Sequence, residues 1–113
     1  MLMETHRVYT LDLALKEVAN ALWKHAVLLG SFSREVAVEK YRVLRRLIDE
    51  KLIVVEHEDQ YLGKALEIAL SFNVTVYDAL YIAQALEKRA RLATSDERQA
   101  RVAKELGIEV LLT

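Results

Sequence analysis

The sequence predicts a mixed α/β fold, with a short parallel sheet flanked by helices, in a single domain over residues 1–113. Two observations predict this class. The last third of the chain alternates between helical and strand-like segments, which is the order of elements in a parallel sheet with helical connections. The chain has 113 residues, 53% of them hydrophobic, which is enough apolar material for one core.

The first half is expected to contain a strand, two helices and a second strand. His6–Thr10 is a short β-prone stretch. Apolar residues at spacings of three and four then predict an amphipathic helix that ends at Gly30. Its stripe comprises Leu11, Leu15, Val18, Leu22, Ala26 and Leu29. Ser33 is a suitable cap for a second helix that runs to about Glu50. The expected inner face of that helix comprises Ala37, Tyr41, Leu44 and Ile48. Leu52–Val55 is short and β-branched, which predicts a strand.

The second half is expected to contain three helices and two strands. A third helix covers about Asp59–Ser71, and a fourth begins after Thr75 and runs to about Arg89. The expected inner residues are Leu62, Leu66, Ala69 and Leu70 in the third helix, and Ala79, Ile82, Ala83 and Leu86 in the fourth. Leu92–Thr94 then predicts a strand, Asp96–Leu106 a helix and Ile108–Leu112 a final strand.

Composition excludes several classes of function. The formal net charge is −1, so no overall cationic field attracts nucleic acid, and any such binding must use local patches. The chain has no cysteine, which excludes disulfides and thiolate metal sites and fits a reducing compartment. No apolar run approaches the roughly 20 residues that span a bilayer, and the first residues do not resemble a signal peptide. A cytoplasmic protein without membrane contact is therefore expected.

Three acidic residues are candidates for a metal site. Asp96 directly follows the strand Leu92–Thr94, and ligands of parallel sheets bind at the carboxyl ends of the strands. Asp78 lies in the first turn of its helix and Glu17 lies within the first helix. Carboxylates are the hard oxygen ligands that Mg²⁺ and Mn²⁺ prefer. Each acid also has an ordinary structural interpretation, because Asp78 and Asp96 suit helix starts and Glu17 suits a solvated helix face.

The sequence around these acids resembles the PIN-domain ribonucleases, most closely the VapC toxins of prokaryotic toxin–antitoxin pairs. The resemblance spans nearly the whole chain and depends on the runs Lys16–Leu22, Val74–Ala83 and Ala93–Arg98. It implies a PIN-like three-layer fold and a metal-dependent endoribonuclease with a site of four carboxylates. Glu17, Asp78 and Asp96 would hold Mg²⁺ or Mn²⁺, and Thr94 would help to place the substrate or a metal-bound water. Thr94 could equally satisfy only a backbone group at the helix start.

In the family, an opening strand carries the first acid and precedes the segment matched here by Arg7–Thr10. Nothing before Arg7 can serve as that strand, so we expect an N-terminally truncated fold with three of the four acids. Weak metal binding and low or absent turnover would follow, unless the chain is recorded from an internal start such as Met1. The alternative function is a catalytically silent module that dimerises or binds an antitoxin. Exposed sheet edges and Trp23 in the first helix favour a homodimer.

Clusters of charged residues allow two interpretations. One cluster contains Arg42, Arg45 and Arg46, and the other contains Lys88, Arg89, Arg91, Arg98 and Arg101. Both could follow an RNA backbone. Acids interspersed among them favour instead a solvated surface held by ion pairs. The run Glu56–Asp59 could be a metal cluster or the acidic first turn of a helix.

Overall fold

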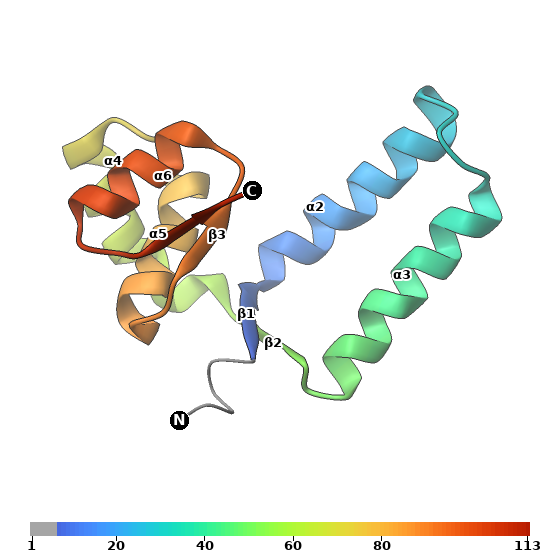
Figure 1. The fold of residues 1–113 in the computed structure, drawn as a ribbon, viewed down its shortest axis with the longest axis horizontal. Helices are drawn as coiled ribbons and strands as arrows, with labels where there is room; N and C mark the ends of the chain where they lie inside the picture. Colours follow the sequence, from blue (N-terminus) through green and yellow to red (C-terminus); the bar gives the residue numbers. More distant parts are fainter. Residues whose placement is uncertain (1–6) are drawn as a thin grey trace. The chain divides into compact units, whose positions relative to one another are not determined.

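The computed structural model describes residues 7–113, which divide after Glu56 into two compact units (Figure 1). His6, the first residue of the predicted strand His6–Thr10, lies outside the described residues. Both units combine short parallel strands with helices, so the mixed α/β class is confirmed.

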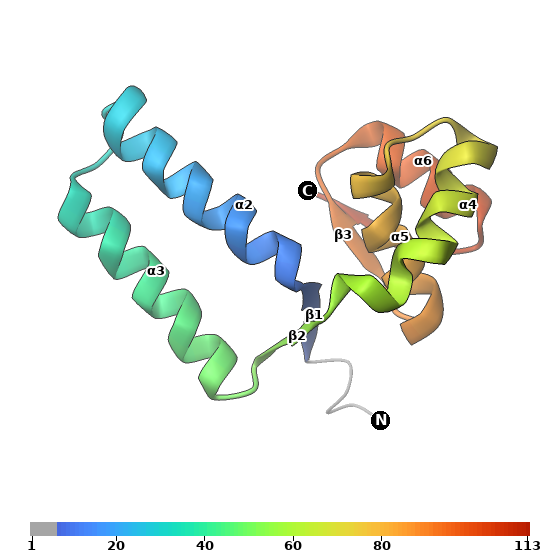
Figure 2. The same ribbon diagram turned by 180° about the vertical axis from the view of Figure 1, so that it is seen from behind.

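The first unit is a helical hairpin that leads out of and back into a two-stranded parallel ladder. Its elements are β1 (Val8–Leu11), α2 (Asp12–Trp23), the π-helical turn η1 (Lys24–Leu28), α3 (Arg34–Asp49) and β2 (Ile53–Glu56). Strands β1 and β2 pair in parallel from Val8 opposite Ile53 to Leu11 opposite Glu56. Helices α2 and α3 lie side by side and run in opposite directions, as both views show (Figures 1 and 2).

The second unit packs two α-helices against a third, α5, together with a second parallel ladder. Its elements are the 3₁₀ turn η2 (Glu58–Tyr61), α4 (Leu62–Phe72), α5 (Val76–Lys88), β3 (Leu92–Thr94), α6 (Glu97–Glu105) and β4 (Val110–Leu112). Strand β3 pairs with β4 in parallel, from Leu92 opposite Val110 to Thr94 opposite Leu112. The helix, strand, helix, strand order expected for this region is therefore confirmed.

Local signals set the ends of the helices. The Ser33 hydroxyl accepts a hydrogen bond from the Val36 N–H at 3.1 Å and so caps α3, as expected. Gly30 and Gly107 follow helical segments and have φ angles of 63° and 84°, a region in which a side chain is strained. Asn73 takes the same left-handed conformation after α4, with a φ angle of 56°. Asparagine tolerates this conformation better than most residues, so it ends α4 without a glycine.

Helix α5 presents the expected face to the core of the second unit. Ala79, Ile82 and Ala83 are buried and Leu86 is half-buried, which confirms the prediction. Helix α4 packs on α5 through Ala65 and Ile68, both buried. Alanines on both helices remove side-chain bulk from the contact, which lets two helix backbones approach closely.

The inner face predicted for the third helix is wrong. Leu66 is 51% exposed and Leu70 is 77% exposed, and Leu62 is also exposed. The expected helix is divided into the 3₁₀ turn η2 and α4, and the face of α4 that packs on α5 contains Ala65 and Ile68. Small residues at the contact with α5 then fix Ala65 and Ile68, instead of the leucines, as the buried positions.

Candidate functional site

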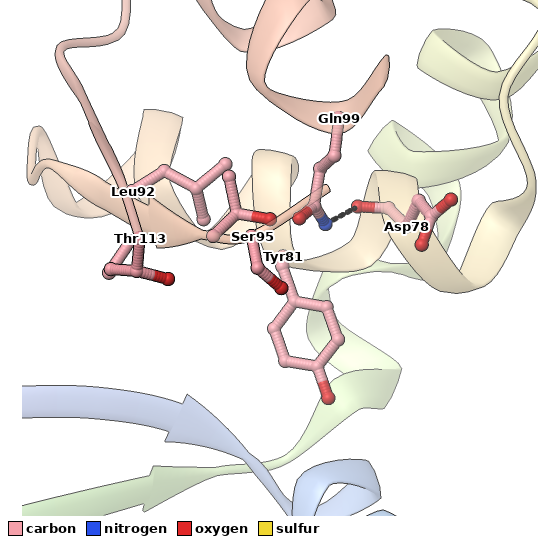
Figure 3. Close-up of a pocket in the computed structure, with 8 residues that line it drawn as sticks. Asp78, Tyr81, Leu92, Ser95, Gln99 and Thr113 are labelled. Atoms are coloured by element: carbon pink, nitrogen blue, oxygen red, sulfur yellow. Dashed lines mark hydrogen bonds between the residues drawn. The ribbon is translucent and has the colours of Figure 1, made fainter. Parts of the chain in front are cut away.

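An open pocket of about 410 Å³ lies in the second unit, next to the carboxyl end of β3. Its polar lining comes from α5, from β3 and the turn after it, from the first part of α6 and from the last residue of the chain. These residues are Asp78, Tyr81, Thr94, Ser95, Gln99 and Thr113, and Leu92 and Ala93 complete the lining. Figure 3 shows this group, with the Gln99 amide directed at the backbone oxygen of Asp78. The pocket is at the sheet edge where ligands of parallel sheets bind.

Asp78 reaches this pocket from the first turn of α5. Its backbone N–H donates to the Thr75 hydroxyl at 3.1 Å. Thr75 is thus the N-cap of α5, and this bond holds Asp78 in the first turn of the helix. The side chain is half-buried, and its carboxylate points away from the Gln99 amide in Figure 3. Among residues 7–113 this carboxylate has no hydrogen-bond or ion-pair partner, so both of its oxygens are open to a ligand.

Asp96 and Thr94 form the turn between β3 and α6. The Thr94 hydroxyl accepts from the Asp96 N–H at 3.0 Å. One Asp96 oxygen, Oδ1, accepts from the N–H groups of Arg98 at 2.8 Å and of Gln99 at 3.1 Å. The structural interpretation of both residues is thus confirmed: Thr94 satisfies a backbone group, and Asp96 is the N-cap of α6. Within the described part of the chain, the second Asp96 oxygen makes no such bond.

Gln99 joins the two acidic segments and was missed by sequence reasoning. Its side-chain Nε2 donates to the backbone oxygen of Asp78 at 2.9 Å, and its own N–H donates to the Asp96 carboxylate. Gln99 is only 7% exposed, and a buried amide without such partners would be costly. The signal in the sequence is a polar residue on the otherwise apolar face formed by Ala100, Val102 and Ala103. That face predicts a buried amide, but it does not identify the partner.

Glu17 lies on α2 of the first unit, where its side chain is exposed. The prediction that Glu17 shares a site with Asp78 and Asp96 therefore stays a prediction. Within each unit, no group of three or more His, Asp or Glu side chains among the described residues is placed to hold a metal ion. In the run Glu56–Asp59, Glu58 and Asp59 form the acidic first turn of η2, as expected if the run begins a helix.

The donor set at the pocket nevertheless suits a hard divalent cation. Asp78, Thr94 and Ser95 line the pocket with one carboxylate and two hydroxyls. Asp96 does not line it, but the turn that Asp96 occupies directly follows Thr94 and Ser95, and its second oxygen has no partner among residues 57–113. Mg²⁺ and Mn²⁺ prefer carboxylate and water oxygens and usually retain several waters, so two protein carboxylates from one unit can form part of their shell.

Comparison with known proteins identifies the family. The PIN domain family matches residues 1–105 of this chain. Ribonuclease VapC3 of Pyrobaculum aerophilum is 37% identical over 97 residues, which cover 86% of this chain and 72% of that protein. The chain is a VapC-like PIN-domain protein. The family resemblance of the acidic runs is thus confirmed, and so is the PIN-like fold class.

The arginines on α3 of this PIN-domain protein belong to an ion-paired surface. Arg42 and Arg46 lie 3.7 and 3.8 Å from the carboxylate of Glu39, and Arg45 lies 3.9 Å from Asp49. All these side chains are largely exposed, so the pairs contribute little to stability. For this cluster the solvated interpretation is confirmed.

None of the individual helices described in this PIN-domain protein has the length and apolarity needed to cross a membrane. Among the described residues, the helix pair Glu58–Phe72 and Val76–Lys88 has this length and apolarity only when its two helices are counted together, and the pair is bent by 115°.

Proposed function

We propose that this chain is a metal-dependent endoribonuclease of the VapC type that acts in the cytoplasm. The proposal rests on one observation above all, which is that Gln99 ties the Asp78 and Asp96 segments together at the carboxyl end of β3. The 37% identity to a protein named a ribonuclease supports the reaction class.

Each residue has a defined task in this proposal. Glu17, Asp78 and Asp96 would hold Mg²⁺ or Mn²⁺, and the bound ion would activate water and neutralise charge on the cleaved phosphodiester. Asp96 uses Oδ1 to cap α6, so only its other oxygen is available to the ion. The Thr94 hydroxyl already accepts the Asp96 N–H, which leaves its proton to donate to substrate or water. With three protein carboxylates, we expect metal binding in the millimolar range and low turnover.

The direct test is cleavage of an unstructured RNA in the presence of Mn²⁺. Asp96→Asn is the decisive variant, because asparagine is as good an N-cap as aspartate but removes the charge that holds the metal. We expect cleavage to fall by at least about 100-fold, as loss of a group that stabilises charge in the transition state does. Asp49→Asn is the matched control, since it removes an exposed carboxylate on α3 and should leave the rate unchanged. Equal rates in Asp96→Asn and the unaltered chain would refute this site.

A second candidate function is association without catalysis, as a homodimer or with an antitoxin-like partner. The observation that favours it is that α2, η1 and α3 contain no buried residue. Trp23 is 51% exposed and Leu28 is 61% exposed, and both belong to the hairpin end of the first unit. Large exposed apolar side chains of this kind mark interaction surfaces, and a twofold dimer is the commonest way to cover them.

Light scattering at micromolar concentration tests the homodimer. We expect twice the chain mass of 13.0 kDa for the unaltered chain, and the single mass for Trp23→Glu. Lys64→Glu makes a comparable charge change on an exposed position of α4 and should remain dimeric. A folded monomer in all three proteins would exclude the homodimer. Robust RNA cleavage that Asp96→Asn abolishes would exclude a silent module.

A further inference from the structure

A second pocket, of about 290 Å³, lies on the other flank of α6. Its lining combines the end of α4 and the turn after it with one face of α6: Phe72, Asn73, Arg98, Arg101, Val102 and Glu105. Arg98 and Arg101 are three residues apart on a helix, so their side chains leave neighbouring positions on the same face. The pocket is thus a polar hollow with two guanidinium groups at its edge.

These two arginines differ from the paired arginines of α3 and from Arg91 in having no ion pair among the described residues. Arg42, Arg45 and Arg46 are paired with carboxylates on α3, and Arg91 lies 4.0 Å from Glu109. Arg98 and Arg101 have no ion pair with any residue from 7 to 113, although both are exposed. Guanidinium groups without a carboxylate partner remain available to an anion, and they match the geometry of phosphate oxygens.

The second pocket is lined by the helix that Asp96 caps. Arg98 and Gln99 are consecutive residues of α6, and the N–H groups of both donate to Asp96 Oδ1. Gln99 faces the first pocket while Arg98 lines the second. The cap of α6 therefore ties Asp96 to one residue of each pocket, Gln99 of the first and Arg98 of the second.

From this arrangement we infer that Arg98 and Arg101 hold the phosphodiester backbone of single-stranded RNA beside the Asp96 site. This inference rests on the proposed function, because it assigns the path of the same substrate. A continuous strand that reaches Asp96 has further phosphates on either side of the cleaved one. Arg98 and Arg101 bind these by charge, without reading the bases. Glu105, on the same lining, opposes this binding.

Equilibrium binding of a short fluorescein-labelled oligouridine in EDTA tests the inference without cleavage. The chain is titrated by fluorescence anisotropy at several salt concentrations. Each phosphate contact on a single strand contributes about 0.7 to the slope of log K against log salt, so the double variant Arg98→Gln/Arg101→Gln should lose about 1.4. Arg42→Gln/Arg45→Gln removes the same charge from ion-paired positions and should keep the original slope.

Two further variants keep the test independent of folding defects. Arg98→Lys/Arg101→Lys retains both charges and should keep the slope. Glu105→Gln removes the acid of the pocket and should bind RNA several-fold more tightly at low salt. Circular dichroism of each variant confirms that α6 is intact.

The inference fails if the glutamine double variant keeps the slope of the unaltered chain, or if the unaltered chain does not bind the oligouridine. It also fails if a polyglutamate peptide binds equally well with the same dependence on Arg98 and Arg101. The proposed function fails on a different result, the absence of cleavage in Mn²⁺. A chain that cleaves RNA with an unchanged salt slope would retain the proposed function and lose this inference.

Discussion

The two units of the chain differ in how they use their apolar residues. In the first unit, none of the helical segments α2, η1 and α3 contains a buried residue. Leu11 of β1 is the buried apolar residue among residues 7–56. In the second unit, α5 alone contains six buried residues, and α4 and α6 add more. Both units have well-defined helices and a parallel ladder. The difference shows that local sequence is sufficient to specify elements, whereas a core requires surfaces from several elements at once.

This contrast matches the division of tasks in the proposed function. The pocket with Asp78, Thr94 and Gln99 is built entirely by the second unit, which has the packed core to hold it in place. The first unit supplies Glu17 from an exposed helix, together with the apolar hairpin end that we assign to a partner. A precise site requires side chains whose positions are fixed by packing.

The sharpest comparison is between a core residue of one unit and an apolar surface residue of the other. Ile82 is fully buried in α5, so Ile82→Ala should lower the free energy of unfolding by about 2–5 kcal/mol. Leu28→Ala removes a side chain that is 61% exposed and should cost less than about 0.5 kcal/mol. Urea denaturation measures both values. A loss of several kcal/mol for Leu28→Ala that grows with protein concentration would show that a second copy buries this residue.

An intermediate effect is expected at the hydrogen bond that joins the two acidic segments. Gln99→Leu is similar in volume but leaves the backbone oxygen of Asp78 without its donor, which should cost about 1–3 kcal/mol. The rate of RNA cleavage should fall by more than the loss of folded protein explains, because the Asp78 and Asp96 segments lose the side-chain hydrogen bond that joins them. Gln60→Leu is the control, since Gln60 bonds only to the nearby, exposed His57 oxygen. Full activity in Gln99→Leu would show that Gln99 is not needed to position the site.

The smallest effects are expected at the helix caps, one from each unit. Ser33→Ala removes the cap of α3 and Asp96→Ala removes the cap of α6, so each should cost about 1 kcal/mol. Asp96→Asn should cost only a few tenths, because the asparagine oxygen accepts the same two N–H groups. Thermal unfolding compares the three variants. A stability loss in Asp96→Asn as large as that in Asp96→Ala would mean that the charge, and not the acceptor, stabilises α6.

Most element boundaries were predictable because they depend on neighbours in the sequence. Ser33, Thr75 and Asp96 each cap the helix that follows within three residues, and Gly30 and Gly107 follow helical segments in a conformation suited to glycine. The inward face of α4 was not predictable from its leucines. The contact with α5, whose facing residues are largely alanines, decided instead that Ala65 and Ile68 are buried.

The candidate site also combines features that local sequence determines with features that depend on packing. The sequence by itself determined which acids are present, where each lies relative to the start of its helix, and the family to which they belong. It also determined that Asp96 caps its own helix with one oxygen. Only the tertiary structure decided that the Asp78 carboxylate has no partner among residues 7–113. It also decided that Gln99 is the residue that connects the Asp78 and Asp96 segments. The physical reason is distance along the chain: a cap acts within a few residues, whereas the bond from Gln99 to Asp78 joins groups 21 residues apart and exists only once α5 and α6 have packed.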